Sequence, residues 1–144
     1  MQTLRVARVR SHARLPNRKH PEDAGLDLYA AETVIVPPHS PGIVPTGIAV
    51  EIPGGYVGLL KPKGRNDHLL GAGVIDAGYQ GEILAKIVNP FPHSLVINAG
   101  EAIGQLLILP ILTPAVEEVT PEELRQKPSE RGSSGGIVDQ YLLR

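Results

Sequence analysis

The sequence lacks cysteine and tryptophan, and its aromatic residues are limited to four tyrosines and one phenylalanine. Without cysteine, the chain has neither a disulfide framework nor a thiolate metal site. No apolar run approaches the roughly 20 residues that a membrane helix needs, and the basic N-terminus has no apolar stretch of the signal-peptide kind. The formal net charge of −1 argues against a nucleic-acid surface, which requires clustered positive charge. We therefore expect a soluble cytoplasmic protein without membrane or nucleic-acid partners; a place in a virus particle stays open.

Glycine and proline are abundant instead, with 16 and 14 residues. Both break helices and favour turns, and valine and isoleucine are frequent between them. This composition predicts an all-β fold of many short strands. One helix start is present at Thr120-Pro121-Glu122-Glu123, where a threonine cap precedes proline and glutamate. Pro128 limits that short helical segment to about residues 120–126.

The length of 144 residues suits a single compact domain. We place this β domain at residues 1–128 and a Gly/Ser-rich C-terminal arm at residues 129–144. Strand candidates alternate with turn signals along the domain, at Leu4–Val9, Thr33–Val36, Ile43–Ile52, Tyr56–Leu60, Gly73–Ile75, Glu82–Val88, Ser94–Ile97 and Ala102–Leu109.

Glycines and prolines also suggest how these strands connect. Ile43–Ile52 is expected to be one long strand with a bulge at Gly47. Pro53-Gly54-Gly55 is a strong turn signal, and Tyr56–Leu60 is the expected returning strand. Lys61–Gly71 is polar and is predicted to be mostly loop, whereas Asn98-Ala99-Gly100-Glu101 resembles a hairpin turn.

An isolated acid and one of the few aromatics occur together in Gly73-Val74-Ile75-Asp76-Ala77-Gly78-Tyr79-Gln80-Gly81-Glu82. Asp76 is either a turn-capping residue or a carboxylate that orients and deprotonates water. Tyr79 is either packing in the turn or a ligand contact, because an aromatic face packs well on a sugar or a base. The glycines around it let a ligand approach the backbone closely.

Three further sites carry candidate chemistry. Asp27, between two leucines, is either an exposed acid on a half-buried strand or an oxygen ligand for Mg²⁺, direct or through water. Gln105 lies in an apolar strand, where its amide needs either a core hydrogen bond or a contact with phosphate or water. Arg131 precedes Gly132-Ser133-Ser134-Gly135-Gly136, which is either a linker or a loop that wraps an anion.

In their order along the chain these segments resemble the conserved motifs of the homotrimeric dUTP pyrophosphatase (dUTPase) family. The resemblance runs from about Asp23 to Gly136. Five segments carry it: Ala24–Leu28 (A-G-x-D-L), Pro45–Pro53 with Gly55-Tyr56, Gly73–Glu82, Gly100–Leu106, and Glu130-Arg131-Gly132. The resemblance implies a dUTPase-like β-jelly roll, a homotrimer that exchanges its C-terminal arm between subunits, and Mg²⁺-assisted hydrolysis of dUTP to dUMP and pyrophosphate.

The resemblance also implies roles for the residues at the reacting end of the substrate. Asp76 would orient and deprotonate the water that attacks the α-phosphate. Tyr79 would pack under the deoxyribose and leave no room for a 2′-hydroxyl group. The backbone from Gly71 to Val74, including Gly73, would bind the edge of the uracil.

The resemblance implies a second set of residues for the phosphates and the metal. Asp27 would hold Mg²⁺ through water, and Gln105 would contact the α-phosphate or the catalytic water. Arg131, Gly132 and Ser133 would close over the β- and γ-phosphates from a neighbouring subunit.

Several positions depart from the family pattern. In the second motif, Pro62-Lys63-Gly64-Arg65-Asn66-Asp67-His68 is shortened and lacks the usual serine, so Lys63, Gly64 and Arg65 are the candidate phosphate contacts. Ala102 stands where Arg or Lys is common, Gly71 has no side chain near the base, and Gly136–Asp139 replaces F-G-S-T-G. An active dUTP diphosphatase with altered affinity or base preference remains the first hypothesis. A non-catalytic nucleotide-binding or regulatory protein, or a relative of the dCTP deaminases, is the alternative.

Overall fold

The computed structural model describes residues 3–71 and 73–126. The chain divides into two compact units, Met1–Thr113 and Pro114–Arg144. Within the described residues a single four-residue helix accompanies eleven strands, which confirms the all-β prediction. No helix in the described part of the chain is long and apolar enough to cross a membrane.

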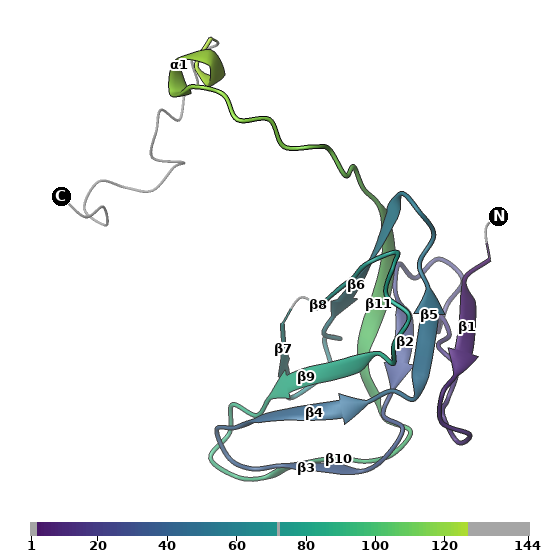
Figure 1. Ribbon diagram of the computed structural model, residues 1–144. Helices are drawn as coiled ribbons and strands as arrows, with labels where there is room; N and C mark the ends of the chain where they lie inside the picture. Colours follow the sequence, from purple (N-terminus) through teal and green to yellow (C-terminus); the bar gives the residue numbers. More distant parts are fainter. Residues whose placement is uncertain (1–2, 72, 127–144) are drawn as a thin grey trace. The chain divides into compact units, whose positions relative to one another are not determined.

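The eleven strands all belong to the first unit (Figure 1). In chain order they are β1 (Arg5–Arg8), β2 (Leu26–Tyr29), β3 (Val34–Val36), β4 (Pro41–Pro45), β5 (Ile48–Glu51), β6 (Tyr56–Lys61), β7 (Leu69–Leu70), β8 (Gly73–Ile75), β9 (Leu84–Val88), β10 (Leu95–Ile97) and β11 (Ala102–Pro110). β7 is a two-residue strand inside the segment that we predicted to be mostly loop.

These strands form small antiparallel sheets rather than one continuous layer. The largest sheet has the order β2-β11-β6-β8, the next has the order β4-β9-β7, and two ribbons pair β1 with β5 and β3 with β10. The nine-residue β11 is the longest strand and pairs with both β2 and β6. Short strands in several sheets suit a chain in which glycine or proline interrupts most apolar runs.

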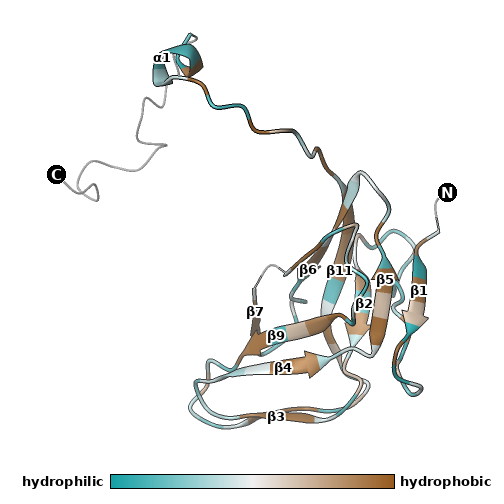
Figure 2. Ribbon diagram, viewed as in Figure 1, coloured by the Kyte–Doolittle hydropathy of each residue, from teal (hydrophilic) through white to brown (hydrophobic). Residues whose placement is uncertain are grey.

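The hydrophobic core lies where the inward faces of these sheets meet. In β9, Ala85 and Ile87 are fully buried while Leu84, Lys86 and Val88 are exposed, so the predicted strand in this segment is confirmed. Val44 on β4 and Leu106 on β11 are also fully buried, so strands of different sheets share one core. Figure 2 shows apolar residues concentrated on the strands and polar residues in the connecting loops.

The segment Ile43–Ile52 is not one strand with a bulge, as we predicted. It forms β4, which pairs with β9, and β5, which pairs with β1. Gly47 separates the two strands with φ at +70°, a conformation that glycine adopts without the strain that a side chain would bring. A Cβ atom at Gly47 would also lie 2.6 Å from the Cβ of Ala13. Gly47 is therefore the point where the chain changes sheets.

Two predicted turns are present but join different partners from those expected. β6 does not pair with β5 after the turn at Pro53-Gly54-Gly55; it pairs with β11 and β8. The turn at residues 98–101 is closed by the amide of Glu101, which donates to the carbonyl of Asn98 at 3.1 Å. The flanking strands nevertheless belong to different sheets, because β10 pairs with β3 whereas β11 pairs with β2 and β6. Both strand-pairing predictions were wrong.

The described part of the second unit contains α1 (Pro121–Leu124). The hydroxyl of Thr120 accepts a hydrogen bond from the amide of Glu123 at 3.3 Å, so the predicted helix start is confirmed. The helix ends at Leu124, slightly before the predicted limit. The predicted arm at residues 129–144, with Arg131, Gly132 and Ser133, lies outside the described residues.

Candidate active site

Asp76 directly follows β8 and begins a tight turn. Its backbone carbonyl accepts a hydrogen bond from the amide of Tyr79 at 3.0 Å, so the backbone alone closes the turn. The carboxylate is exposed, and no residue in the described ranges forms a hydrogen bond or an ion pair with it. A capping aspartate would use its side chain to close the turn. The structure therefore favours the alternative, a carboxylate that is available to water or to a ligand.

Tyr79 is held at the surface beside this acid. Its side chain belongs to a residue that is 45% exposed, so it is not a core residue. The hydroxyl donates a hydrogen bond to the backbone carbonyl of Glu82 at 2.7 Å. A Cβ atom at Gly81 would lie 2.7 Å from the Tyr79 hydroxyl oxygen, so a residue without a side chain is needed there. Gly81, two residues after the tyrosine, thus makes room for the ring of Tyr79.

A small cavity of about 190 Å³ lies beside the turn. It brings together three of the residues predicted for base and sugar, namely Gly73, Val74 and Tyr79. The remaining lining residues are Leu60, Ile75, Glu82, Ile83 and Leu84. The cavity is smaller than the roughly 300–1,000 Å³ of typical ligand pockets, so it suits one ring of a ligand rather than a whole nucleotide. Gly71 is exposed and does not line it.

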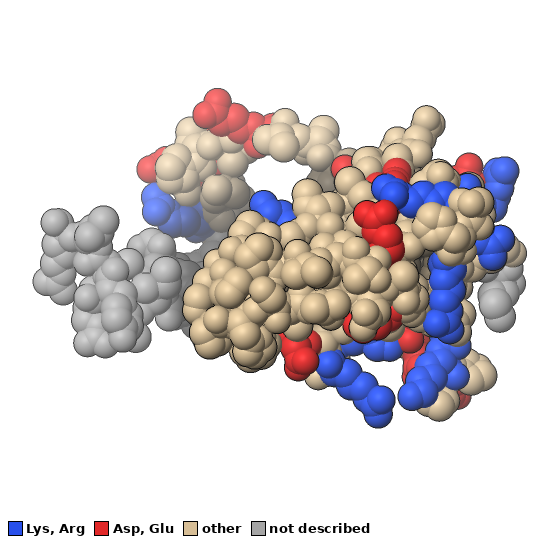
Figure 3. Space-filling model, turned by 90° about the horizontal axis from the view of Figure 1, so that it is seen from below, with Lys and Arg blue, Asp and Glu red and all other residues tan. Residues whose placement is uncertain are grey.

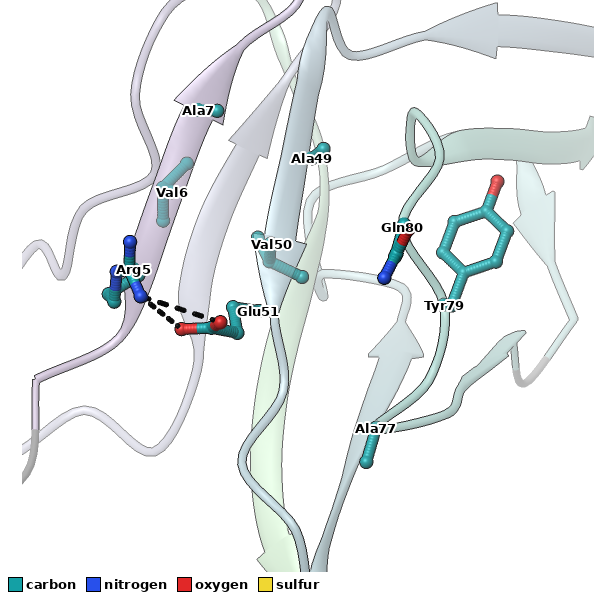
Figure 4. A pocket seen from close by; sticks show the side chains of 9 residues that line it. All are labelled: Arg5, Val6, Ala7, Ala49, Val50, Glu51, Ala77, Tyr79 and Gln80. Atoms are coloured by element: carbon teal, nitrogen blue, oxygen red, sulfur yellow. Dashed lines mark hydrogen bonds and ion pairs between the residues drawn. The ribbon is translucent and has the colours of Figure 1, made fainter.

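A larger cavity of about 390 Å³ lies between the β1–β5 ribbon and the same turn (Figure 4). Tyr79 lines this cavity as well, together with Ala77 and Gln80. On the ribbon side, Arg5 and Glu51 form an ion pair at 3.2 Å, and both side chains are largely exposed. Tyr79 therefore borders both cavities.

A second polar cluster lies on the four-stranded sheet. β2 carries Asp27 directly opposite Gln105 on β11. The carboxylate of Asp27 contacts the Nζ atom of Lys63 at 2.6 Å, and the two side chains are only 15% and 24% exposed. The side-chain amide of Gln105 donates to the carbonyl of Pro62 at 3.0 Å. The structure thus brings together three predicted residues from the first, second and fourth motifs.

A glycine next to this cluster lets Gln105 reach its position. A Cβ atom at Gly25 would overlap the side-chain oxygen of Gln105. The alternative of an exposed acid on a half-buried strand does not apply to Asp27, because its carboxylate is shielded and contacts the ammonium group of Lys63. Gln105 satisfies its amide with a backbone carbonyl, and its side chain is still half-buried rather than enclosed.

Asn66 shapes the loop that carries Lys63, and we did not single it out from the sequence. Its side-chain oxygen accepts a hydrogen bond from the amide of Lys63, and its side-chain amide donates to the carbonyl of Ala102, both at 3.0 Å. Asparagine side chains often bond to the backbone in turns. An asparagine three residues after Lys63 was therefore the feature of the sequence that could have predicted this contact. Gly64 and Arg65, at the tip of this loop, are exposed, and within the described residues Arg65 has no acidic partner.

The two clusters lie far apart within one chain. β11 aligns Gln105 with Asp27 on one side and with Lys61 on the other. On β8, Gly73 pairs with Leu60 of β6, one residue before Lys61. The strand then runs away from the row of Asp27, Gln105 and Lys61 toward Asp76. Four residue steps of about 3.3 Å and three strand spacings of about 4.8 Å place Asp76 on the order of 20 Å from Asp27.

The described residues do not provide a full set of protein ligands for a metal ion. They contain no group of three or more histidine, cysteine, aspartate or glutamate side chains that could hold a metal ion. Asp27 is a single carboxylate that already contacts an ammonium group. Such a residue can bind a water molecule of a hydrated metal ion, but it does not provide a complete coordination shell.

Comparison with protein families gives a match to the dUTPase model over residues 11–135. The deoxyuridine 5′-triphosphate nucleotidohydrolase of Mycolicibacterium vanbaalenii is 40% identical over 141 residues, which cover 92% of each chain. The enzyme of the same name from a Mycobacterium species is also 40% identical, over 147 residues, 93% of this chain and 96% of the relative.

Solved structures of phage dUTPases resemble the fold. The dUTPase of Staphylococcus bacteriophage 80alpha, solved with dUPNHPP, has a TM-score of 0.85 and 33% identity, and the match covers 94% of this chain and 96% of the other. A mutant dUTPase from phage phi11 of S. aureus, with a coordinated structural Mg(II) ion, has a TM-score of 0.78 and 32% identity, over 85% of this chain and 99% of the other. This likeness confirms the expected dUTPase-like jelly roll.

Proposed function

Because this chain belongs to the dUTPase family, we propose that it hydrolyses dUTP to dUMP and pyrophosphate, with Asp76 as the base that activates water. The observation that carries the assignment of Asp76 is its exposed carboxylate, which closes no turn and lies three residues from Tyr79 at the edge of a cavity. The enzyme is thus a dUTP diphosphatase, a hydrolase of nucleotide metabolism that supplies dUMP.

The reaction is an attack of water on the α-phosphorus of dUTP. Asp76 accepts a proton from the attacking water while the oxygen of that water forms the new bond to the α-phosphorus. The bond between the α-phosphorus and the bridging oxygen breaks, and pyrophosphate leaves. A positioned base of this kind typically contributes about 10²–10⁴-fold to the rate.

The small cavity supplies the sites for base and sugar. Tyr79 packs against the deoxyribose and leaves no space for a 2′-hydroxyl group. The backbone groups of Gly73 and Val74, together with that of Gly71 before them, bind the edge of the uracil. The glycine at position 73 supports this role, because a ligand can approach its backbone closely.

The cluster around Asp27 supplies the sites for the phosphates. Mg²⁺ bound to the triphosphate neutralises its charge and makes the phosphorus easier to attack. Asp27 holds the water shell of that ion, and Gln105 contacts the α-phosphate. Lys63 and Arg65, with the backbone of Gly64, bind the remaining phosphate oxygens. Since Lys63 pairs with Asp27, Arg65 is the more available of the two cations.

One chain alone does not assemble this site. The proposed reaction requires Asp76 and Gln105 to reach the same phosphate. Within one chain, however, the strands place Asp76 on the order of 20 Å from the cluster of Asp27 and Gln105. We therefore assign the two clusters of one site to different subunits of a homotrimer. In this arrangement the arm of a neighbouring subunit closes the site with Arg131, Gly132 and Ser133.

Exposed apolar residues support the assembly. Ile35 on β3 and Val96 on β10 face each other in the ribbon and are 65% and 48% exposed. Ile43 on β4 is 57% exposed, and the middle of the face seen in Figure 3 is largely uncharged. Leu112, after β11, is 91% exposed. Ile35, Val96 and Ile43 lie on neighbouring strands, since β3 contacts both β10 and β4, and exposed apolar side chains that gather in this way usually mark contacts with another chain.

Pyrophosphate release with Mg²⁺ and dUTP, dTTP, dCTP or UTP tests the function directly. We expect release from dUTP, and its loss in the Asp76→Asn variant. Saturable binding of dUTP without release would favour the non-catalytic alternative. Appearance of a uracil nucleotide from dCTP would instead indicate deamination.

A further inference from the structure

Glu82 anchors the ring of Tyr79, although no motif role was assigned to it from the sequence. The Tyr79 hydroxyl donates to the backbone carbonyl of Glu82 at 2.7 Å, and this is its one hydrogen bond within the described residues. The orientation of the ring therefore depends on where the backbone of Glu82 lies. Gly81, between the two residues, and Gly78, before Tyr79, allow a wide range of backbone conformations. Contacts from outside this glycine-rich segment therefore help to hold it in place.

The carboxylate of Glu82 provides that hold. One of its oxygens accepts hydrogen bonds from the amide of Gly47 at 2.9 Å and from the Nε atom of Arg10 at 3.0 Å. The Glu82 side chain is 19% exposed and that of Arg10 is 36% exposed, so the ion pair is partly shielded from water. Arg10 also contacts Glu32 at 3.4 Å, which limits its own freedom. Hydrogen bonds to charged groups are roughly twice as strong as neutral ones.

The fold does not need this side chain to place the next strand. The amide of Ile83 donates to the carbonyl of Ile48 at 2.9 Å, and its carbonyl accepts from the hydroxyl of Thr46 at 2.6 Å. The first of these bonds also holds the planar peptide unit that carries the Glu82 carbonyl. The Glu82 carboxylate adds a second hold, through Gly47 and Arg10, at the end of the segment that carries Tyr79.

We propose that Glu82, held by Arg10 and Gly47, is a positioning residue that fixes the Tyr79 ring in the orientation that excludes ribose. The proposal rests on the proposed function of Tyr79 as the residue under the deoxyribose. A ring that is free to tilt opens space for the 2′-hydroxyl group, so UTP is accepted more readily. The carboxylate of Asp76 forms no hydrogen bond with Glu82 in the part of the chain that the structure describes, so the chemical step is affected less.

The test compares dUTP with UTP in variants of this network. In Glu82→Ala we expect the preference for dUTP over UTP, as the ratio of kcat/KM values, to fall about tenfold. The change should lie mainly in a lower KM for UTP, with kcat for dUTP within about twofold of the wild type. Glu82→Gln retains an oxygen that accepts from the Gly47 amide, so it should recover part of the preference. Arg10→Ala should lower it in the same direction.

The matched control is the Arg5–Glu51 ion pair, which has a similar distance of 3.2 Å but no bond to the Tyr79 segment. Glu51→Gln should leave the preference unchanged. Tyr79→Phe keeps the ring and removes only the bond to Glu82, so it should resemble Glu82→Ala even if the latter folds poorly. An unchanged preference in a folded Glu82→Ala protein, or in Tyr79→Phe, would overturn the proposal.

Binding of the non-hydrolysable imido analogues of dUTP and UTP separates this proposal from the proposed function. Their Kd ratio reports discrimination without turnover. If the wild type bound the dUTP analogue selectively but released no pyrophosphate, the catalytic role of Asp76 would fail, while the Kd ratio in Glu82→Ala would still decide the role of Glu82. Equal binding of both analogues by the wild type would remove the proposal together with the sugar role of Tyr79.

Discussion

The turn at residues 76–81 and the cluster around Asp27 are both polar, but they differ in how their charges are satisfied. Asp76 is exposed and makes no ion pair in the described residues, whereas Asp27 is largely shielded and contacts Lys63 at 2.6 Å. A shielded charge needs a partner to be stable, so the Asp27 pair is consistent with a structural as well as a binding role. An exposed acid that closes no turn has no structural reason for its position. This difference supports the proposed roles, with Asp76 as the reactive group and Asp27 as a group that positions the substrate.

The largest expected effect is on turnover when Asp76 changes. Asp76→Asn should lower kcat for dUTP by about 10²–10⁴-fold, measured as pyrophosphate release. Its thermal unfolding should be close to that of the wild type, because the backbone closes the turn. Near-normal turnover in this variant would show that Asp76 is not the base, and a large loss of stability would show that its carboxylate does support the turn.

A smaller but distinct effect is expected at Asp27. Asp27→Asn removes the partner of Lys63 and the group that we propose holds the water shell of Mg²⁺. We expect the Mg²⁺ concentration for half-maximal rate to rise about tenfold, since a hydrogen bond from a charged group contributes roughly 1.5–3 kcal/mol. A titration of the rate with Mg²⁺ measures this. The same curve as for the wild type would reduce the Asp27–Lys63 pair to a structural contact.

Gly81→Ala tests whether the space beside Tyr79 matters. The added Cβ atom would lie 2.7 Å from the Tyr79 hydroxyl oxygen, so the ring must move. We expect KM for dUTP to rise by a factor of about three to ten, in line with about 1 kcal/mol of lost binding. Gly54→Ala is the control, because nothing lies within 4 Å of the Cβ that it adds. Equal KM values for the two variants would contradict the prediction.

The smallest effect is expected at the exposed ion pair of Arg5 with Glu51. Such surface pairs contribute roughly 0–1 kcal/mol, and here the side chains are 79% and 62% exposed. Arg5→Ala should therefore change the free energy of unfolding by less than about 1 kcal/mol, measured by urea titration. A larger loss would mean that the β1–β5 ribbon depends on this pair.

Local patterns predicted the individual strands well. The strand at β9 and the cap at Thr120 depend on neighbouring residues only, and both were predicted correctly. The partners of β5, β6 and β11 were not, because strand pairing joins residues far apart in the sequence. Gly47 illustrates the limit: a bulge and a change of sheet both place glycine in an apolar run, and only the positions of β1 and β9 distinguish them.

For the site, the sequence by itself determined the residue types and their motifs, and hence the family and the roles expected for Asp76, Tyr79 and Asp27. It could not show that Lys63 contacts Asp27, or that Arg10 pairs with Glu82. These contacts join residues that are tens of positions apart, so they exist only once the sheets have packed. The tertiary structure also decided that one chain keeps its two clusters apart, because the width of the sheet sets their separation.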